Sequence, residues 1–179
     1  MKKIYIFDFD DTLWKTSAKV KYKHQHTDNH YFTLEEYVKH TKDHGKKSLL
    51  LDYSEFYDLR ILNAGIPVEP WFSKFIRLLK ENKPVAIITA RARKNSLIKF
   101  FDENLIPINP SMVYAVNDVN ENYIGDVPER KLQAFKKIVD MGYQVTEYHD
   151  DMLDNIKHLE RFAYENNINF KYFHVNEKS

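Results

Sequence analysis

Five short apolar stretches alternate with amphipathic helical patterns along most of the chain. The apolar stretches cover residues 4–9, 85–88, 112–116, 143–148 and 170–175, and their β-branched and aromatic side chains predict buried strands. Apolar residues recur at helical spacing over residues 71–79, 97–105, 132–139 and 153–163. Pro128 and Gly142 mark the two ends of the third helix. This alternation favours an α/β fold, a Rossmann-like parallel sheet with helices on both faces.

A long segment, about residues 15–70, interrupts the alternation after the first strand. It is too long for a simple connection, so we expect a small insertion, acting as a flap or small cap on a single domain of residues 1–179. Residues 19–24 alternate like a strand with one basic face. Thr33 and Glu36 have the spacing of a capping box, which predicts helix over residues 33–38.

Composition excludes some classes of protein and selects no partner. The chain has 179 residues, a formal net charge of +1 and no cysteine, so disulfides and thiolate metal sites are excluded. No stretch approaches the roughly 18–20 apolar residues of a membrane span, and Asp8 cuts the first apolar run too early for a secretory signal. We therefore expect a cytoplasmic protein with no membrane contact, and we infer no obligate protein partner.

Carboxylates follow the predicted strands at two places. Asp8, Asp10 and Asp11 end the first strand, and Asp150 and Asp151 follow the fourth. Asp8 and Asp10 are two residues apart, so their side chains share a direction while the chain stays extended. Carboxylates held this close repel one another and need a cation between them. An all-oxygen site suits a hard cation, most simply Mg²⁺.

A hydroxyl and an ammonium group complete the predicted site. Thr89 ends the second strand, and Lys131 falls near the first turn of the third helix, from which its side chain leans back toward the same edge of the sheet. In open α/β sheets this edge holds the ligand. Together with a divalent cation, these groups suit a phosphoryl group, and one carboxylate can attack phosphorus.

The ordered set of motifs resembles the haloacid dehalogenase superfamily of phosphohydrolases. Residues 8–12 read DFDDT, which matches its DxDxT motif, and Thr89 matches its second motif. Lys131 is similar to the third, although Lys136 and Lys137 lie nearby. The fourth, an acidic pair, is found at residues 150–151, followed by Asn155. The sequence departs from many members at His149, where Gly is common, and at Asn155, where a second acid is common.

The resemblance implies a role for each matching residue. Asp8 would be the nucleophile that forms an aspartyl-phosphate, and Asp10 would protonate the leaving group and then activate water. The phosphoryl group would be bound by Thr89, Ala90 and Lys131. Mg²⁺ would be held by Asp8, the backbone carbonyl of Asp10, and Asp150 or Asp151. The substrate would be a phosphorylated molecule. Asp10, the second Asp of the DxDxT motif, indicates phosphate rather than carbon–halogen chemistry.

Several alternatives stay open at this stage. Any single acid, Thr89 or Lys131 could be an ordinary cap, turn or surface residue. Arg91 and Arg93 could contact substrate, but we expect surface charges. The basic stretch Lys19–Lys23 and its neighbouring aromatic residues suit a nucleotide or a nucleic-acid end, and a solvated strand over a small aromatic core explains them equally well. A zinc site could be formed by His24, His26 and His30. Their spacing fits no compact zinc signature well, so we expect them to be polar loop residues.

The sequence favours a Mg²⁺-dependent phosphatase acting on a nucleotide or polynucleotide end. The alternatives are the same chemistry on a small metabolite such as a sugar phosphate, and a catalytically silent binding module.

Overall fold

The computed structural model describes residues 1–23, 30–33, 35–37, 39, 42 and 50–176. The chain divides into two compact units, one formed by residues 1–15 and 66–179 and the other by residues 16–65. No helix in these described ranges is long and apolar enough to cross a membrane.

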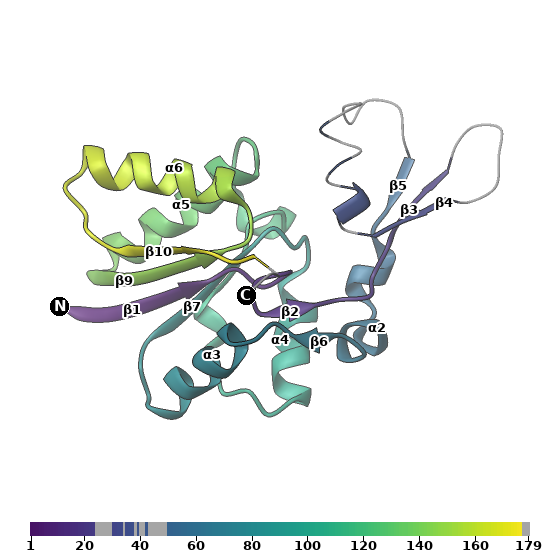
Figure 1. Ribbon diagram of the computed structural model, residues 1–179, viewed down its shortest axis with the longest axis horizontal. Helices are drawn as coiled ribbons and strands as arrows, with labels where there is room; N and C mark the ends of the chain where they lie inside the picture. The colour runs from purple at the N-terminus through teal and green to yellow at the C-terminus, as the bar shows by residue number, and fades with distance from the viewer. Residues whose placement is uncertain (24–29, 34, 38, 40–41, 43–49, 177–179) are drawn as a thin grey trace. The chain divides into compact units, whose positions relative to one another are not determined.

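A five-stranded sheet with all neighbours parallel forms the centre of the larger unit (Figure 1). Its strand order is β10-β9-β1-β7-β8. The strands are β1 (Lys2–Phe7), β7 (Val85–Thr89), β8 (Val113–Ala115), β9 (Tyr143–Asp150) and β10 (Lys171–His174). The predicted α/β class with a parallel sheet is confirmed.

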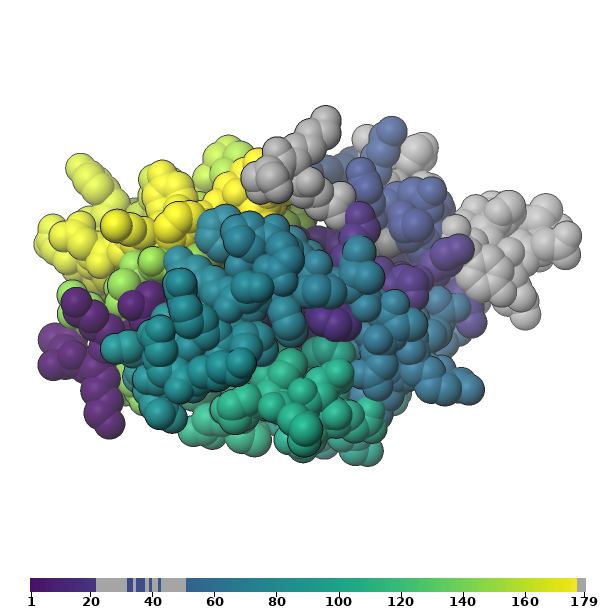
Figure 2. Space-filling model, turned by 60° about the horizontal axis from the view of Figure 1, so that its bottom comes forward, coloured from purple at the N-terminus to yellow at the C-terminus, as the bar shows by residue number. Residues whose placement is uncertain are grey.

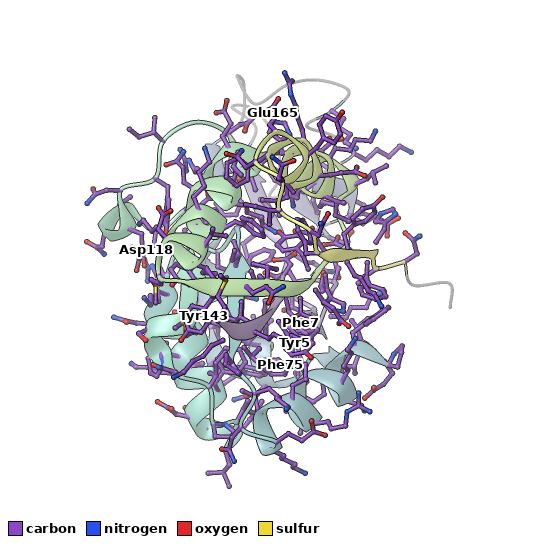
Figure 3. All side chains as sticks on the ribbon, turned by 90° about the vertical axis from the view of Figure 1, so that its left-hand side faces the viewer. Tyr5, Phe7, Phe75, Asp118, Tyr143 and Glu165 are labelled. Carbon is purple, nitrogen blue, oxygen red and sulfur yellow. The ribbon has the colours of Figure 1, made fainter. Side chains whose placement is uncertain are left out.

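Helices cover both faces of this sheet, as the sequence predicts (Figure 1). One face is covered by α5 (Val127–Asp140) and α6 (Leu153–Glu165), and the other by α3 (Trp71–Lys80) and α4 (Lys94–Glu103). Figure 2 shows the molecule from the side of α3 and α4. Ile4 and Ile6 of β1 pack into the core with α5 and α6. Phe7 points to the other face, where its ring lies 5.7 Å from that of Phe75 (Figure 3).

The helix ends follow local capping chemistry. Asp126 and Glu129 form a capping box at the start of α5, and Gly142 follows its last turn with a φ of +83°. The predicted bounds of this helix are therefore confirmed. The prediction for α4 is wrong at its C-terminal end: the helix stops at Glu103, and Leu105 has a φ of +54° and is 90% exposed.

The first strand ends at Phe7, two residues earlier than predicted. A tight turn follows, in which the Phe9 carbonyl accepts the backbone N–H groups of Thr12, Leu13 and Trp14. The turn leads into β2 (Trp14–Lys15), which pairs antiparallel with β6 (Ile66–Pro67). Strands of two residues are too short to give a period-2 pattern, so the sequence did not predict this pair. The larger unit also contains the 3-10 helices η2 (Pro110–Met112) and η3 (Val119–Glu121).

The smaller unit contains a three-stranded antiparallel sheet of order β4-β3-β5. Its elements are β3 (Val20–Lys23), β4 (His30–Phe32), β5 (Leu50–Asp52), η1 (Ser54–Tyr57) and α2 (Leu59–Asn63). The predicted strand at residues 19–24 corresponds to β3. The predicted capping box is present, since Thr33 and Glu36 each bond the other's backbone N–H, and residues 35–37 are helical. His24, His26 and Val38 lie outside the described residues.

A small aromatic core stabilises the smaller unit. Val20 and Phe56 are buried, Tyr37 and Tyr53 pack against them, and the two tyrosine hydroxyls lie 2.5 Å apart. Lys21 of the basic strand pairs with Glu55 at 3.3 Å. These contacts agree with the structural explanation of the basic and aromatic residues. A flap or cap role for the insertion stays a prediction.

Candidate functional site

Three parallel strands end side by side at the predicted site. Phe7 of β1 lies opposite Ile87 of β7 and opposite His149 of β9. Asp8, the next residue, is therefore level with Asp150, and its backbone N–H donates to the carbonyl of His149 at 2.8 Å. Thr89 is the last residue of β7 and is fully buried. The structure thus brings the polar strand ends together at the carboxyl edge of the sheet.

Three carboxylates meet at this edge. One oxygen from each of Asp8, Asp150 and Asp151 lies within 4.8 Å of the others. Lys131 of α5 is 1% exposed, and its Nζ lies 3.1 Å from Asp8 Oδ1 and 2.8 Å from Asp150 Oδ2. One ammonium group faces three acids, so the cluster carries excess negative charge when all of them are ionised. The donor set, all oxygen and partly buried, fits a hard divalent cation.

Asp150 is the most tightly bound of the three acids. Its Oδ2 accepts hydrogen bonds from Lys131, from the Tyr148 hydroxyl at 2.8 Å and from Asn155 Nδ2. Its Oδ1 accepts the Met152 backbone N–H at 2.9 Å and Asn155 Nδ2 at 3.0 Å. With no exposed surface and both oxygens engaged, Asp150 is arranged to orient Lys131. Asp8 and Asp151 leave more of their oxygen atoms for other ligands.

Burial and mutual repulsion change the protonation of the acids. Burial raises the pKa of Asp8 well above its usual range; Lys131 opposes the rise, and the charges of Asp150 and Asp151 add to it. Burial and then the charge of Asp150 raise the pKa of Asp151 to about 7. Burial alone would lower the pKa of Lys131, but the charges of Asp150 and Asp8 outweigh it and raise that pKa. A bound cation would favour the ionised form of both acids.

Asp10 does not join this group of carboxylates, because its side chain is held by Arg91. Arg91 Nε lies 3.0 Å from Asp10 Oδ2 and Nη2 lies 2.8 Å from Oδ1, a bidentate pair. The Arg91 side chain is 4% exposed, and its Cζ lies 5.1 Å from the centre of the Phe9 ring. The expectation of a surface charge is wrong for Arg91, whereas Arg93 is exposed. A metal contact from the Asp10 carbonyl stays a prediction.

The turn after β1 also contacts the fourth motif. Thr12, which ends the DFDDT motif, is fully buried, and its hydroxyl donates to Asp151 Oδ1 at 3.4 Å. Asp11 has a φ of +58°, which tightens this turn. Ala90 is exposed beside Thr89, and its carbonyl accepts a hydrogen bond from Asn117 Nδ2 at 2.7 Å.

His149 and Asn155, the two departures from the resembled motif pattern, make structural contacts. His149 is buried between the rings of Phe7 and Phe173, with centroids 4.2 Å and 4.7 Å away, and its Nδ1 lies 3.2 Å from the Ile6 carbonyl oxygen. Burial lowers its pKa to about 3, so the ring is neutral. Asn155 donates to Asp150 rather than adding an acid. Neither residue adds charge to the carboxylate cluster.

Sequence reasoning missed two side chains that hold the site in place. Arg91 lies two residues beyond Thr89, and in an extended chain that spacing puts both on one side of the backbone. Tyr148 has the same relation to Asp150. Period-2 spacing from a predicted site residue is the signal that could have identified both. No family model matches the chain, and a comparison with curated proteins found no match.

Proposed function

We propose that the protein is a Mg²⁺-dependent phosphatase that hydrolyses a phosphate monoester through an aspartyl-phosphate at Asp8. The observation that carries the proposal is the meeting of Asp8, Asp150 and Asp151 within 4.8 Å, with the buried ammonium of Lys131 bonded to two of them. The order and spacing of the motifs, which resemble the haloacid dehalogenase superfamily, support the same chemistry.

Asp8 and Asp151 are the side chains best placed to hold Mg²⁺. They belong to the cluster, and the oxygens of Asp150 are already engaged by Lys131, Tyr148, Met152 and Asn155. When bound, the cation would offset the charge of the acids and of the phosphoryl oxygens. Asp150 then serves mainly to position Lys131.

Each of these residues has a separate role in the proposed reaction. An oxygen of Asp8 attacks phosphorus and the bond from phosphorus to the ester oxygen breaks. Asp10, which takes up a proton from solvent before this step, gives that proton to the ester oxygen. Water then attacks the phosphorus of the aspartyl-phosphate, Asp10 takes a proton from it, and Asp8 is regenerated as phosphate leaves. Thr89, Ala90 and Lys131 bind the phosphoryl oxygens throughout. Arg91 holds the Asp10 carboxylate in one orientation.

The substrate class that we favour is a nucleotide or a polynucleotide end. A sugar phosphate is the alternative substrate. Hydrolysis of phosphorylated oligonucleotides that exceeds hydrolysis of small esters, and that falls as salt is added, would favour the polynucleotide class. A silent binding module would bind such ligands without releasing phosphate. The full set of Asp8, Asp10, Thr89 and Asp151 argues against the silent module.

The test is phosphate release from a generic aryl phosphate, with Mg²⁺ and with a chelator. We expect turnover that requires Mg²⁺ and is abolished by Asp8→Asn. Asp154→Asn is the matched control, because it removes the same charge from an exposed position in α6. Turnover without the metal, or an Asp8→Asn variant as active as the control, would contradict the proposal.

A further inference from the structure

A pocket lies beside the proposed site, at the same edge of the sheet. It has a volume of about 380 Å³ and is formed by the segment between β8 and α5 together with Arg130. Its size falls within the range of small-molecule sites. Figure 3 labels one of its lining residues, Asp118. Every lining residue belongs to the larger unit.

Backbone and side-chain hydrogen bonds tie this pocket to the phosphate-binding segment. The Val116 N–H donates to the Thr89 carbonyl at 2.8 Å, and the Asn117 N–H donates to the Arg91 carbonyl at 3.3 Å. The Asn117 side chain donates to the Ala90 carbonyl at 2.7 Å. Residues 116–117, which line the pocket, are therefore fixed to residues 89–91. A ligand in the pocket would lie next to a phosphoryl group held by Thr89.

Arg130 is the cationic side chain of the pocket, whose lining also includes the carboxylate of Asp118. Arg130 precedes Lys131 in α5, and consecutive helical residues point in directions about 100° apart, so Lys131 faces the acids while Arg130 lines the pocket. Its Nη1 donates to Asn117 Oδ1 at 2.9 Å, which fixes the guanidinium group. Within the described part of the chain no carboxylate pairs with Arg130, and its buried Nε has no hydrogen-bond partner.

The acids in and near the pocket, Asp118 of the lining among them, already accept hydrogen bonds or form ion pairs with other groups. Asp118 accepts the backbone N–H groups of Lys94 and Asn120, and Glu121 pairs with the Lys94 side chain at 3.1 Å. Glu129 bonds back to the start of α5 in the capping box. Tyr123 also lines the pocket, and its buried hydroxyl has no partner among the described residues. Arg130 is the cationic side chain of the lining, the oxygens of Asp118 already accept backbone N–H groups, and a planar guanidinium suits a phosphate.

We propose that this pocket binds a second phosphate group of the substrate, next to the one that is hydrolysed. The proposal rests on the proposed function for the position of the first phosphate. The second phosphate could be the phosphodiester of a polynucleotide end or a terminal phosphate of a small bisphosphate. Both supply the same anion to Arg130.

The test compares ligands with one and two phosphates in the Asp8→Asn background, where hydrolysis is blocked. The ligands are a nucleoside monophosphate, the matching nucleoside bisphosphate, a dinucleotide with a terminal phosphate, and a hexose monophosphate and bisphosphate. Titration calorimetry gives their dissociation constants. We expect two-phosphate ligands to bind more tightly, and Arg130→Met to reduce that preference about tenfold to a hundredfold. A preference confined to the dinucleotide would show that the pocket binds the phosphodiester. A preference confined to the bisphosphates would show that it binds the terminal phosphate.

Two further variants make the result specific. Arg161→Met removes the same charge from an 83% exposed side chain of α6, so it should keep the full preference. Arg130→Lys keeps the charge without the fork that bonds Asn117, so it should retain an intermediate preference. Equal preference in Arg130→Met and Arg161→Met would overturn the proposal. A preference that depends on Arg130 in a protein without phosphatase activity would leave the pocket standing and remove the proposed function.

Discussion

Replacing Asp151 with Asn should stabilise the protein in the absence of a cation, although Asp151 is a candidate metal ligand. Burial and the charge of Asp150 raise its pKa from the ordinary 3.8 to about 7. At about 1.4 kcal/mol per pKa unit, this difference of about 3 corresponds to about 4 kcal/mol of destabilisation above neutral pH. The carboxyl is partly exposed and solvent screens its charge, so we expect Asp151→Asn to add about 2 kcal/mol.

The pH dependence of this gain follows from the direction of the pKa change. The folded-state pKa lies above that of the unfolded chain, so the folded protein binds the proton more tightly. The cost of Asp151 is absent below the unfolded-state pKa of 3.8. It grows as pH rises from there to about 7 and is complete above that pH. The advantage of the Asn variant should follow the same course.

The assay is thermal unfolding at pH 8 in the presence of a chelator, monitored by tryptophan fluorescence. Both tryptophans, Trp14 and Trp71, belong to the larger unit and so report on the site's own unit. A gain of about 2 kcal/mol corresponds to a Tm rise of about 4–8 °C in a chain of this size. Asp154→Asn, the exposed control, should lower Tm slightly because it removes a favourable charge from the first turn of α6.

Mg²⁺ should reverse the ranking of the two proteins. At a hundred times its dissociation constant, a ligand adds about 2.7 kcal/mol to the stability of the protein that binds it. The wild type should gain this stability, more at pH 8 than at pH 6, because binding must displace the proton of Asp151. The Asn variant should gain much less. A variant no more stable than the wild type in chelator, or an equal gain from Mg²⁺, would refute the reasoning.

Two other substitutions test the remaining contacts of the site. Lys131→Met leaves two buried carboxylates without their ammonium partner, so urea unfolding should show a loss of about 3–5 kcal/mol, whereas exposed Lys136→Met should change little. Equal stability of the two variants would contradict the role given to Lys131. Arg91→Met frees the Asp10 carboxylate, which then no longer has one fixed orientation. The leaving group of an alkyl phosphate needs a proton, whereas that of a dinitrophenyl phosphate does not. We therefore expect the fall in kcat to be at least about tenfold larger for the alkyl phosphate. A uniform loss on both esters would indicate a purely structural role for Arg91.

The sequence predicts the edge of the sheet where the acids meet, because strand ends depend on local pattern. Asp8, Thr89 and Asp150 each follow or end a β-branched or aromatic run, and parallel strands bring such ends to one edge. The capping box and Gly142 likewise fix α5 from local chemistry. These features need no knowledge of distant contacts.

Partner choice within the site could not be predicted in this way. Arg91 and Arg93 have the same side chain two positions apart, and only the packing of the Arg91 guanidinium over Phe9 and against Asp10 buries one of them. The side-chain hydrogen bonds to Asp150 come from three elements, α5, β9 and α6. The sequence alone therefore does not distinguish the role of Asp150 from that of Asp151. The predicted end of α4 is wrong because Leu105 continues the apolar spacing although its backbone has a positive φ, which ends the helix before it.

The central place of β1 in the strand order has a consequence for biosynthesis. Its two neighbours are β7 and β9, and β9 emerges from the ribosome only after most of the chain has been made. Until then the apolar β1 has an unsatisfied edge. Before α5 is made, Asp8 also lacks the ammonium group of Lys131 that it meets in the finished protein. Pairings so distant along the chain form slowly and leave time for aggregation. Nascent chains halted before α5 should therefore depend on chaperones more than chains that also contain α5 and β9.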